Sequence, residues 1–293
     1  MRPAVENDPA GKGRDHCVNA RIDEGTYVIV SIAGLTDVGE SRDHNEDGFL
    51  VFDMALNQEL SEPDLEHSVD QRPLLVAVSD GMGGALAGEV ASALTLDVLR
   101  EHATEAMAFL GGRDSTALES WLADGIHEAN RRVREAARND PSLEGMGATA
   151  TAGLVFPGAM VVAHVGDSRA YHLREGQLRQ VTADHTFVGH LVAQGHLTPE
   201  EAHTHEHRHV LLQAVGVRED LDVDSLTVIL RPDDRLLLCS DGLYDLVSDE
   251  AIVETLAAEG QDPMAQCRAL ITAANSLGGF DNTTIIILHL GGE

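Results

Sequence analysis

Short apolar, β-branched runs alternate with turn signals along most of the chain after residue 26. Such runs have the length and composition of strands. They lie at residues 27–34, 48–54, 74–79, 148–156, 159–164, 170–173, 221–230, 235–240 and 283–290. Pro157-Gly158 and Glu175-Gly176 separate neighbouring runs. Because Pro and Gly favour tight turns, these pairs predict hairpins.

A second pattern, with apolar residues three or four positions apart, predicts helices. Between residues 86 and 110 it places Val90, Leu94 and Val98 on one face, and a similar window covers 118–133. Two more helices are predicted at 249–258 and 263–276. Hairpins come first and helices follow without regular alternation, so we expect an α+β fold with antiparallel sheets and no doubly wound sheet.

Residues 184–215 are polar and irregular, and they form too long a connection for an ordinary loop. We therefore predict a functional flap here. Within it His203, His205, His207 and His209 alternate, so on an extended segment they would share one face. A solvated histidine run is the favoured interpretation. A Zn²⁺ or Ni²⁺ site, or a pH-dependent charge beside the substrate, are the alternatives.

The chain divides into an N-terminal extension and one domain. Residues 1–26 mix Pro, Gly, Asn and charged residues without periodicity, so we expect them to be poorly ordered. Residues 27–293 carry all the predicted elements and form one domain. A chain of 293 residues can bury a sizeable core.

Charge and cysteine usage limit the class of partner. Lys and Arg total 20 against 49 acidic residues, a formal net charge of −29. This balance excludes nucleic acid and an anionic membrane as partners, because both attract basic surfaces. No apolar run approaches the roughly 18 residues that span a bilayer, and the three cysteines are widely separated. We expect a soluble, cytoplasmic monomer.

Five aspartates stand at the ends of predicted strands. They are Asp47, Asp80, Asp167, Asp241 and Asp281, each beside Gly, Asn or Ser. One Asp-Gly pair alone is usually a turn, but five strand-end carboxylates can converge at one end of a β core. Oxygen ligands suit Mg²⁺ and Mn²⁺, and two such ions sharing a carboxylate activate a bridging water. The pattern therefore favours a two-metal hydrolase.

Arg42 lies five residues before Asp47, beside the acidic cluster. A guanidinium binds phosphate through two parallel hydrogen bonds, so Arg42 is a candidate phosphate ligand. A salt bridge to Asp43 or Glu46 is the alternative.

Six segments resemble, in order, the motifs of the metal-dependent (PPM, type 2C) protein phosphatase family in its bacterial form. They are Thr36–Asp47, Asp80–Gly84 with Ala87–Glu89, Gly145–Thr149, Val165–Tyr171, Ser240–Leu243 and Asp281–Thr284. The resemblance implies a four-layer α-β-β-α sandwich with two central antiparallel sheets flanked by helices. It also implies a serine/threonine phosphoprotein phosphatase that uses a metal-bridging water at a dinuclear Mg²⁺ or Mn²⁺ centre and opposes bacterial Ser/Thr kinases.

The resemblance also assigns roles to residues. It implies that Asp80 bridges both ions, that Arg42 binds phosphate and that Asp37 supports the cluster without being a ligand. The implied remaining ligands are Asp241 and Asp281 for the first ion, Asp47 (directly or through water) and the Gly81 carbonyl for the second, Asp167 with Asp241 and Asp245 for a weaker third, and Glu46 through water.

Met82 departs from the eukaryotic pattern, in which a histidine at this position is the proposed general acid. Methionine cannot donate a proton, so a water or another residue must protonate the leaving alkoxide. Three alternatives to a general phosphatase stay open: an enzyme dedicated to one regulatory phosphoprotein, a non-catalytic phosphoprotein-binding relative, and a structural metal protein. The presence of Asp80, Asp241, Asp281 and Arg42 disfavours the non-catalytic relative. A structural metal protein is disfavoured because structural sites are closed by protein ligands, whereas this one leaves room for water.

Overall fold

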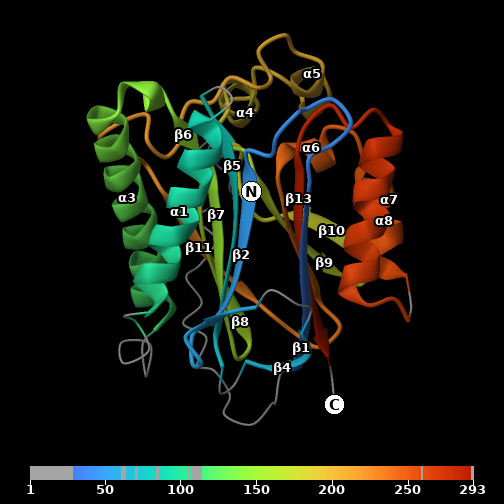
Figure 1. Ribbon diagram of the computed structural model, residues 1–293. Coiled ribbons are helices and arrows are strands. Elements are labelled where there is room, and N and C mark those ends of the chain that lie inside the picture. The colour runs from blue at the N-terminus through green and yellow to red at the C-terminus, as the bar shows by residue number, and fades with distance from the viewer. Residues whose placement is uncertain are drawn as a thin grey trace, which may run out of the picture.

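Two antiparallel β-sheets pack face to face, and helices cover both outer faces (Figure 1). The computed structural model describes residues 29–60, 64–69, 72–83, 86–104, 106, 114–258 and 260–291. Across these residues the predicted four-layer α-β-β-α architecture is confirmed. The predicted N-terminal extension, residues 1–26, lies outside the described residues.

One sheet has six strands within the described residues, and β13 lies at its centre between β12 and β1. Strands β1 and β13 pair along the whole length of β1, with Thr36 opposite Thr284 and Asp37 opposite Thr283. The strand order is β10 (Gln177–Gln180), β9 (Arg169–Arg174), β12 (Arg235–Cys239), β13 (Thr283–Gly291), β1 (Ile29–Asp37), β4 (Asp64–Ser68). The hairpin predicted at residues 175–176 joins β9 to β10, and both turn residues have positive φ.

The other sheet has seven strands in the described part of the chain, and β5 lies near its centre. The strand order is β11 (Asp224–Ile229), β8 (Ala159–Val165), β7 (Ala150–Phe156), β5 (Leu74–Met82), β2 (Asp47–Asp53), β3 (Gln58–Glu59), with β6 (Gly147–Ala148) paired to the end of β5. The register of β2 and β5 sets Asp47 directly opposite Asp80. Strand pairing alone thus brings two of the predicted ligands together.

Alternate residues of β5 enter two different cores. Leu75 and Ala77 pack under the helices, whereas Leu74, Val76 and Val78 enter the core between the sheets. Both faces of the strand are covered, which explains why its sequence is a continuous apolar run. The covering helices are α1 (Ala87–Thr104) and α3 (Ser115–Asn139) over this sheet, and α7 (Asp249–Ala257) and α8 (Pro263–Ser276) over the other.

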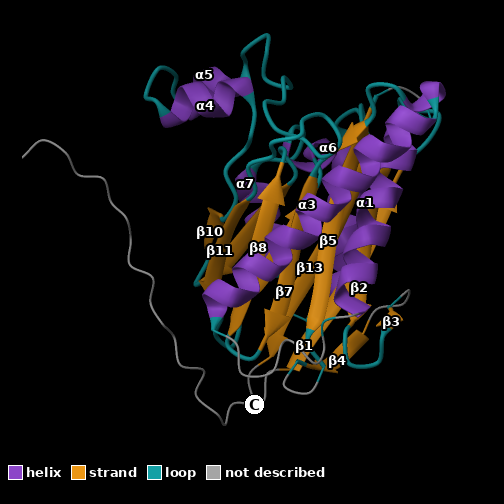
Figure 2. Ribbon diagram, turned by 90° about the vertical axis from the view of Figure 1, so that its left-hand side faces the viewer, coloured by secondary structure: helices purple, strands orange, loops and turns teal. Residues whose placement is uncertain are grey.

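The predicted flap projects from one end of the sandwich (Figure 2). It contains two short helices, α4 (Phe187–Ala193) and α5 (Pro199–His203), that the sequence analysis did not predict. Threonine side chains cap both helices at Thr186 and Thr198. Backbone hydrogen bonds close the base of the flap, from Phe187 N to Val210 O (2.8 Å) and from Leu212 N to His185 O (2.7 Å).

None of the helices in the described part of the chain combines the length and hydropathy needed to cross a bilayer. Of the cysteines, Cys239 and Cys267 are buried free thiols. Cys17 lies outside the described residues.

The core between the sheets should contribute strongly to stability. Leu238 is fully buried there, opposite Ile286 on β13. Leu238→Ala should lower the free energy of unfolding by about 2–5 kcal/mol, because it removes buried apolar contacts and leaves a cavity. Ile229→Ala, at a position 40% exposed, is the matched control and should change it by about 0.5 kcal/mol or less. Equal losses in urea unfolding would contradict this assignment of the core.

Candidate metal centre

Strand ends and loops from both sheets meet around a cavity of about 350 Å³ at the end of the sandwich that carries the flap. Carboxylates from four separate segments line it: Asp80, Asp167, Asp241 and Asp281. Arg42, His44, Glu46, Gly81, Met82 and His209 line it as well. Four of the five strand-end aspartates thus line one cavity, and Asp47 lies opposite Asp80 on the neighbouring strand β2.

Asp47 and Asp80 form the base of this cluster. Burial, then the charge of Asp281, raises the pKa of Asp47 to about 6, although a hydrogen bond from Ser240 Oγ to Asp47 Oδ2 (2.6 Å) opposes the shift. Burial, followed by the charges of Asp47 and Asp241, holds the pKa of Asp80 well above its ordinary value. Positive charge nearby would favour the ionised form of both carboxylates.

Thr149 fixes the backbone of Asp80. Its hydroxyl accepts a hydrogen bond from Asp80 N (2.9 Å), and its own amide donates to Asp80 O (2.8 Å). The Thr149 hydroxyl also bonds to Ser168 Oγ at 2.6 Å, beside Asp167. The Gly-Ala-Thr segment is thus a support that positions two of the acids, a role the sequence analysis did not assign.

Gly81 must be a glycine because two backbone segments meet there. A Cβ at this position would lie 2.1 Å from the carbonyl oxygen of Gly88 and 2.7 Å from that of Glu46. The amide of Gly81 donates to Glu46 O at 3.1 Å. This packing brings Gly81 to the wall of the cavity, where the resemblance places a carbonyl ligand.

Asp241 and Asp281 come from the other sheet. Asp241 is the first residue of the short helix α6 (Asp241–Tyr244), directly after β12, and Asp281 lies two residues before β13. Burial, then the charges of Asp167 and Asp281, raises the pKa of Asp241 well above its ordinary value. Position 242 must also be a glycine, because a Cβ there would lie 2.1 Å from Asn282 O.

Asn282 fastens the loop that carries Arg42. Its Oδ1 accepts from Glu46 N (2.8 Å), and its Nδ2 donates to Val38 O (2.9 Å) and His44 O (3.0 Å). Asn282 is 3% exposed, whereas its three partners are only partly buried. The loop is thereby held against the start of β13, next to Asp281.

Arg42 pairs with Asp281, through a contact of 2.6 Å between NH2 and Oδ2. The sequence analysis offered Asp43 or Glu46 as partners, and within the described residues the structure forms neither pair. The Arg42 side chain is 43% exposed and lies on the wall of the cavity. A guanidinium with this access can bind an incoming anion.

Asp37 and Glu46 occupy supporting positions. Asp37 Oδ1 accepts from Gly39 N (2.9 Å) and Asn275 Nδ2 (3.0 Å), so it ties the loop to α8. Glu46 lines the cavity, and its Oε1 lies 3.3 Å from His44 Nε2.

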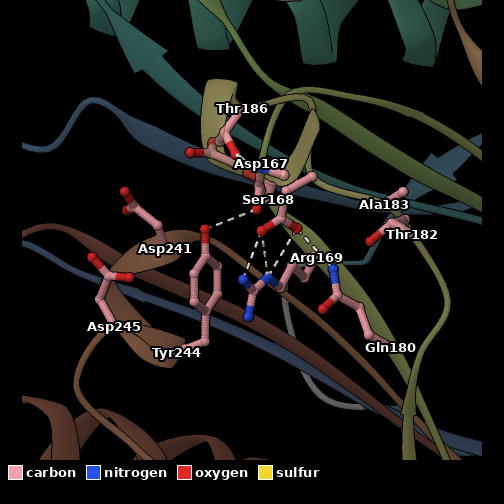
Figure 3. Close-up of polar contacts among 12 residues, drawn as sticks. Asp167, Ser168, Arg169, Gln180, Thr182, Ala183, Thr186, Asp241, Tyr244 and Asp245 are labelled. Atoms are coloured by element: carbon pink, nitrogen blue, oxygen red, sulfur yellow. Dashed lines mark hydrogen bonds and ion pairs between the residues drawn. The ribbon is translucent and has the colours of Figure 1, made fainter. Parts of the chain in front are cut away.

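Asp167 lies beside a partly buried cluster centred on Arg169 (Figure 3). Arg169 makes an ion pair of 2.6 Å with Asp184 and stacks on the ring of Tyr244, 3.5 Å from its centroid. The Tyr244 hydroxyl donates to the Asp167 carbonyl at 3.0 Å. Burial, then the charge of Asp184, raises the pKa of the Asp167 carboxyl to about 7. Arg169, Asp184 and Tyr244 were missed as site residues, because only the fold brings them together.

The histidine run is not an extended segment. His203 ends α5, and the residues from 204 to 209 form turns, so the four histidines do not share one face. His205 and His207 lie near Phe187, with ring centroids about 6 Å from its own. His209 alone of the four lines the acidic cavity.

The donor set fits hard divalent cations. Mg²⁺ and Mn²⁺ prefer carboxylate, carbonyl and water oxygens, which is what Asp80, Asp241, Asp281 and Gly81 present. Burial, followed by the charges of neighbouring acids, raises the pKa values of Asp47, Asp80 and Asp241. Metal binding would supply the positive charge that favours their ionised forms.

Known proteins are similar to this chain in sequence and architecture. The model of the family described as protein phosphatase 2C matches residues 59–278. The serine/threonine phosphatase stp of Listeria monocytogenes is 36% identical over 87% of this chain and 93% of its own length. The serine/threonine protein phosphatase PstP of Mycobacterium tuberculosis is 40% identical over 76% of this chain, which spans 41% of that relative.

A solved structure extends the likeness to the whole fold. The catalytic domain of serine threonine protein phosphatase PstP, in complex with two manganese ions, superposes with a TM-score of 0.73 at 34% identity. The match covers 90% of this chain and 99% of the other. The family model, the relatives and the four-layer fold agree, and the chain belongs to the protein phosphatase 2C (PPM) family of metal-dependent serine/threonine phosphatases.

Proposed function

We propose that the cavity lined by Asp80, Asp241, Asp281 and Arg42 is where this phosphatase hydrolyses phosphoserine and phosphothreonine esters. The observation that carries the proposal is the convergence of these four side chains, from both sheets, on one cavity. An acidic wall with one exposed arginine suits a phosphate that arrives together with divalent cations. A non-catalytic phosphoprotein-binding protein would not need three carboxylates in the same wall.

Asp80 would contact both ions, Asp241 and Asp281 the first, and Asp47 and the Gly81 carbonyl the second, with Glu46 acting through water. When bound, Mg²⁺ or Mn²⁺ supplies Lewis-acid activation of water and neutralises phosphate charge. Manganese is the metal in the related PstP structure, which supports Mn²⁺ here. The hydrogen bonds of Thr149 and Ser240 hold Asp80 and Asp47 in place, so the chain keeps its ligands fixed during turnover.

Arg42 would bind the non-bridging phosphate oxygens. The Asn282 bonds position its loop, and the ion pair with Asp281 holds the guanidinium at the cavity wall. Substrate phosphate would share this guanidinium with Asp281, so binding needs no large movement of the chain.

Phosphorylated proteins are the proposed partners, and the enzyme would oppose bacterial serine/threonine kinases. Relatives named serine/threonine phosphatases support this role. A single dedicated phosphoprotein substrate stays the alternative, and a phosphoproteome of a deletion strain would distinguish the two. Cytoplasmic location and the monomeric state stay predictions.

Replacing Asp80 tests the metal centre. Asp80→Asn should lower kcat/KM for p-nitrophenyl phosphate and for a phosphothreonine peptide by about 100-fold or more, because it removes a charged ligand from both ions. Asp97→Asn, on the exposed face of α1, is the control and should leave turnover unchanged. Undiminished turnover by Asp80→Asn would contradict the assignment.

Removing the metal tests the same centre without a mutation. EDTA should abolish hydrolysis of both substrates, and added Mn²⁺ should restore it, because chelation removes the cations that would activate water. Activity that persists after dialysis against EDTA would exclude metal-dependent hydrolysis.

Replacing Arg42 tests phosphate binding. Arg42→Ala should raise KM for the phosphopeptide by about 10- to 100-fold, the loss expected for charge-assisted hydrogen bonds. It should change kcat much less, because phosphate is bound in the ground state as well. Arg100→Ala is a matched control, since Arg100 is 41% exposed and also ion-paired. A fall in kcat at unchanged KM would contradict this role.

A further inference from the structure

Exposed apolar side chains stand close to the acidic cavity. Nine large hydrophobic side chains are exposed among the described residues. Three of them, Leu86, Val210 and Phe280, lie within three residues in sequence of one that lines the cavity, and each comes from a different segment. Exposed apolar residues scattered singly are normal on any protein surface, whereas a gathering of them beside a cavity marks an interaction surface.

Phe280 is the one aromatic side chain among the nine, and it is 64% exposed. It directly precedes Asp281, which lines the cavity and pairs with Arg42. Leu277, 56% exposed, is the C-cap of α8 three residues earlier. Figure 1 shows the connection from α8 to β13 at the end of the sandwich that carries the flap. An exposed aromatic ring and an exposed leucine therefore stand next to the proposed phosphate ligand.

The backbone around Phe280 holds its ring in place. The ring lies against Gly278, because a Cβ at that position would lie 2.4 Å from the ring's Cζ. The carbonyl of Gly279 accepts a hydrogen bond from Glu40 N (2.8 Å), on the loop that carries Arg42. The aromatic ring and the guanidinium thus stand on two segments that are bonded to each other. A surface held in this way loses little conformational freedom when a ligand covers it.

A phosphate bound by Arg42 determines where the rest of a substrate lies. Arg42 NH2 is 2.6 Å from Asp281 Oδ2, so the phosphorylated residue must stand close to the segment that leads into β13. An extended peptide advances about 3.3 Å per residue. Side chains up to about three positions from the phosphorylated residue are therefore within reach of Phe280. An apolar side chain that covers the ring removes apolar surface of both partners from water.

We propose that Phe280 and Leu277 form an apolar subsite that binds an apolar side chain of the phosphoprotein, within about three residues of the phosphorylated serine or threonine. The inference rests on the proposed function, because Arg42 and Asp281 place the phosphate. It defines the substrate class more closely, since phosphosites flanked by a residue such as leucine are preferred over phosphosites flanked by small or polar residues. The small substrate p-nitrophenyl phosphate has no flanking residue, so the subsite contributes to peptide hydrolysis alone.

The test uses phosphothreonine peptides in which one leucine replaces alanine, in turn, at each of about three positions on either side of the phosphothreonine. The full-length protein with Mn²⁺ should hydrolyse at least one leucine peptide with a kcat/KM about fivefold or more above that of the alanine peptide, mainly through KM. Phe280→Ala should remove this preference. Phe280→Leu, which keeps an apolar side chain, should retain most of it.

Two controls separate the subsite from the metal centre and from general surface effects. Phe280→Ala should hydrolyse p-nitrophenyl phosphate within about twofold of wild type, because the ring does not contact the phosphate. Leu56→Ala is the matched variant, since Leu56 is 58% exposed in the turn between β2 and β3, at the other end of β2 from Asp47. It should keep the preference for leucine.

Four results would overturn this inference and leave the proposed function standing. They are no preference for leucine in wild type, an unchanged preference in Phe280→Ala, an equal fall in p-nitrophenyl phosphate turnover by that variant, and a stronger preference for arginine than for leucine at the sensitive position. Hydrolysis of p-nitrophenyl phosphate without hydrolysis of any phosphothreonine peptide would overturn both.

Discussion

Repulsion among carboxylates at one end of the sandwich is the constraint on which the rest of this structure depends. Asp47, Asp80, Asp167 and Asp241 each have a raised pKa, because burial and neighbouring acids both disfavour their charged forms. The chain as a whole carries a net charge of −29, so its basic residues are too few to balance its acids. The acids stay together because strand pairing fixes their backbones, and divalent cations are what such an arrangement can bind.

The apolar and turn patterns were enough to predict most of the fold. The continuous apolar run at residues 74–79 predicted a strand. The run is continuous because both faces of β5 are buried. The edge strand β10 was missed because its sequence, Gln-Leu-Arg-Gln, is largely polar and lies at the margin of its sheet. The flap helices were missed because they are short and begin at threonine caps without a long apolar period.

The carboxylates of the candidate site could also be predicted, since each stands where an apolar run ends. Their supports could not. Ser240 and Asp47 are 193 positions apart in sequence, and the hydrogen bond between them depends on how two different sheets pack. Asn282 likewise reaches back to Val38 and His44. Arg169 looked like one residue of a motif, and only the fold gives it Asp184 and Tyr244 as partners.

The cluster around Arg169 also connects the start of the flap to Asp167. Asp184 is the first residue of the flap, and the next amide, His185 N, donates to Gly166 O at 2.7 Å, directly before Asp167. The base of the flap is therefore built from the same few residues that hold Asp167. Its far end returns at Leu212, whose amide donates to His185 O. Both ends of the flap are therefore hydrogen-bonded, through His185, to the backbone next to Asp167.

Met82 bears on the last chemical step, the protonation of the leaving alkoxide. Its side chain lines the cavity but holds no proton, so the leaving alkoxide must be protonated by water or by another group on the wall. Two histidines lie there, His44 beside Glu46 and His209 beside Asp241 and Asp245. Histidine is the side chain that most often serves as a general acid, so the step that Met82 cannot perform falls to one of these imidazoles or to water.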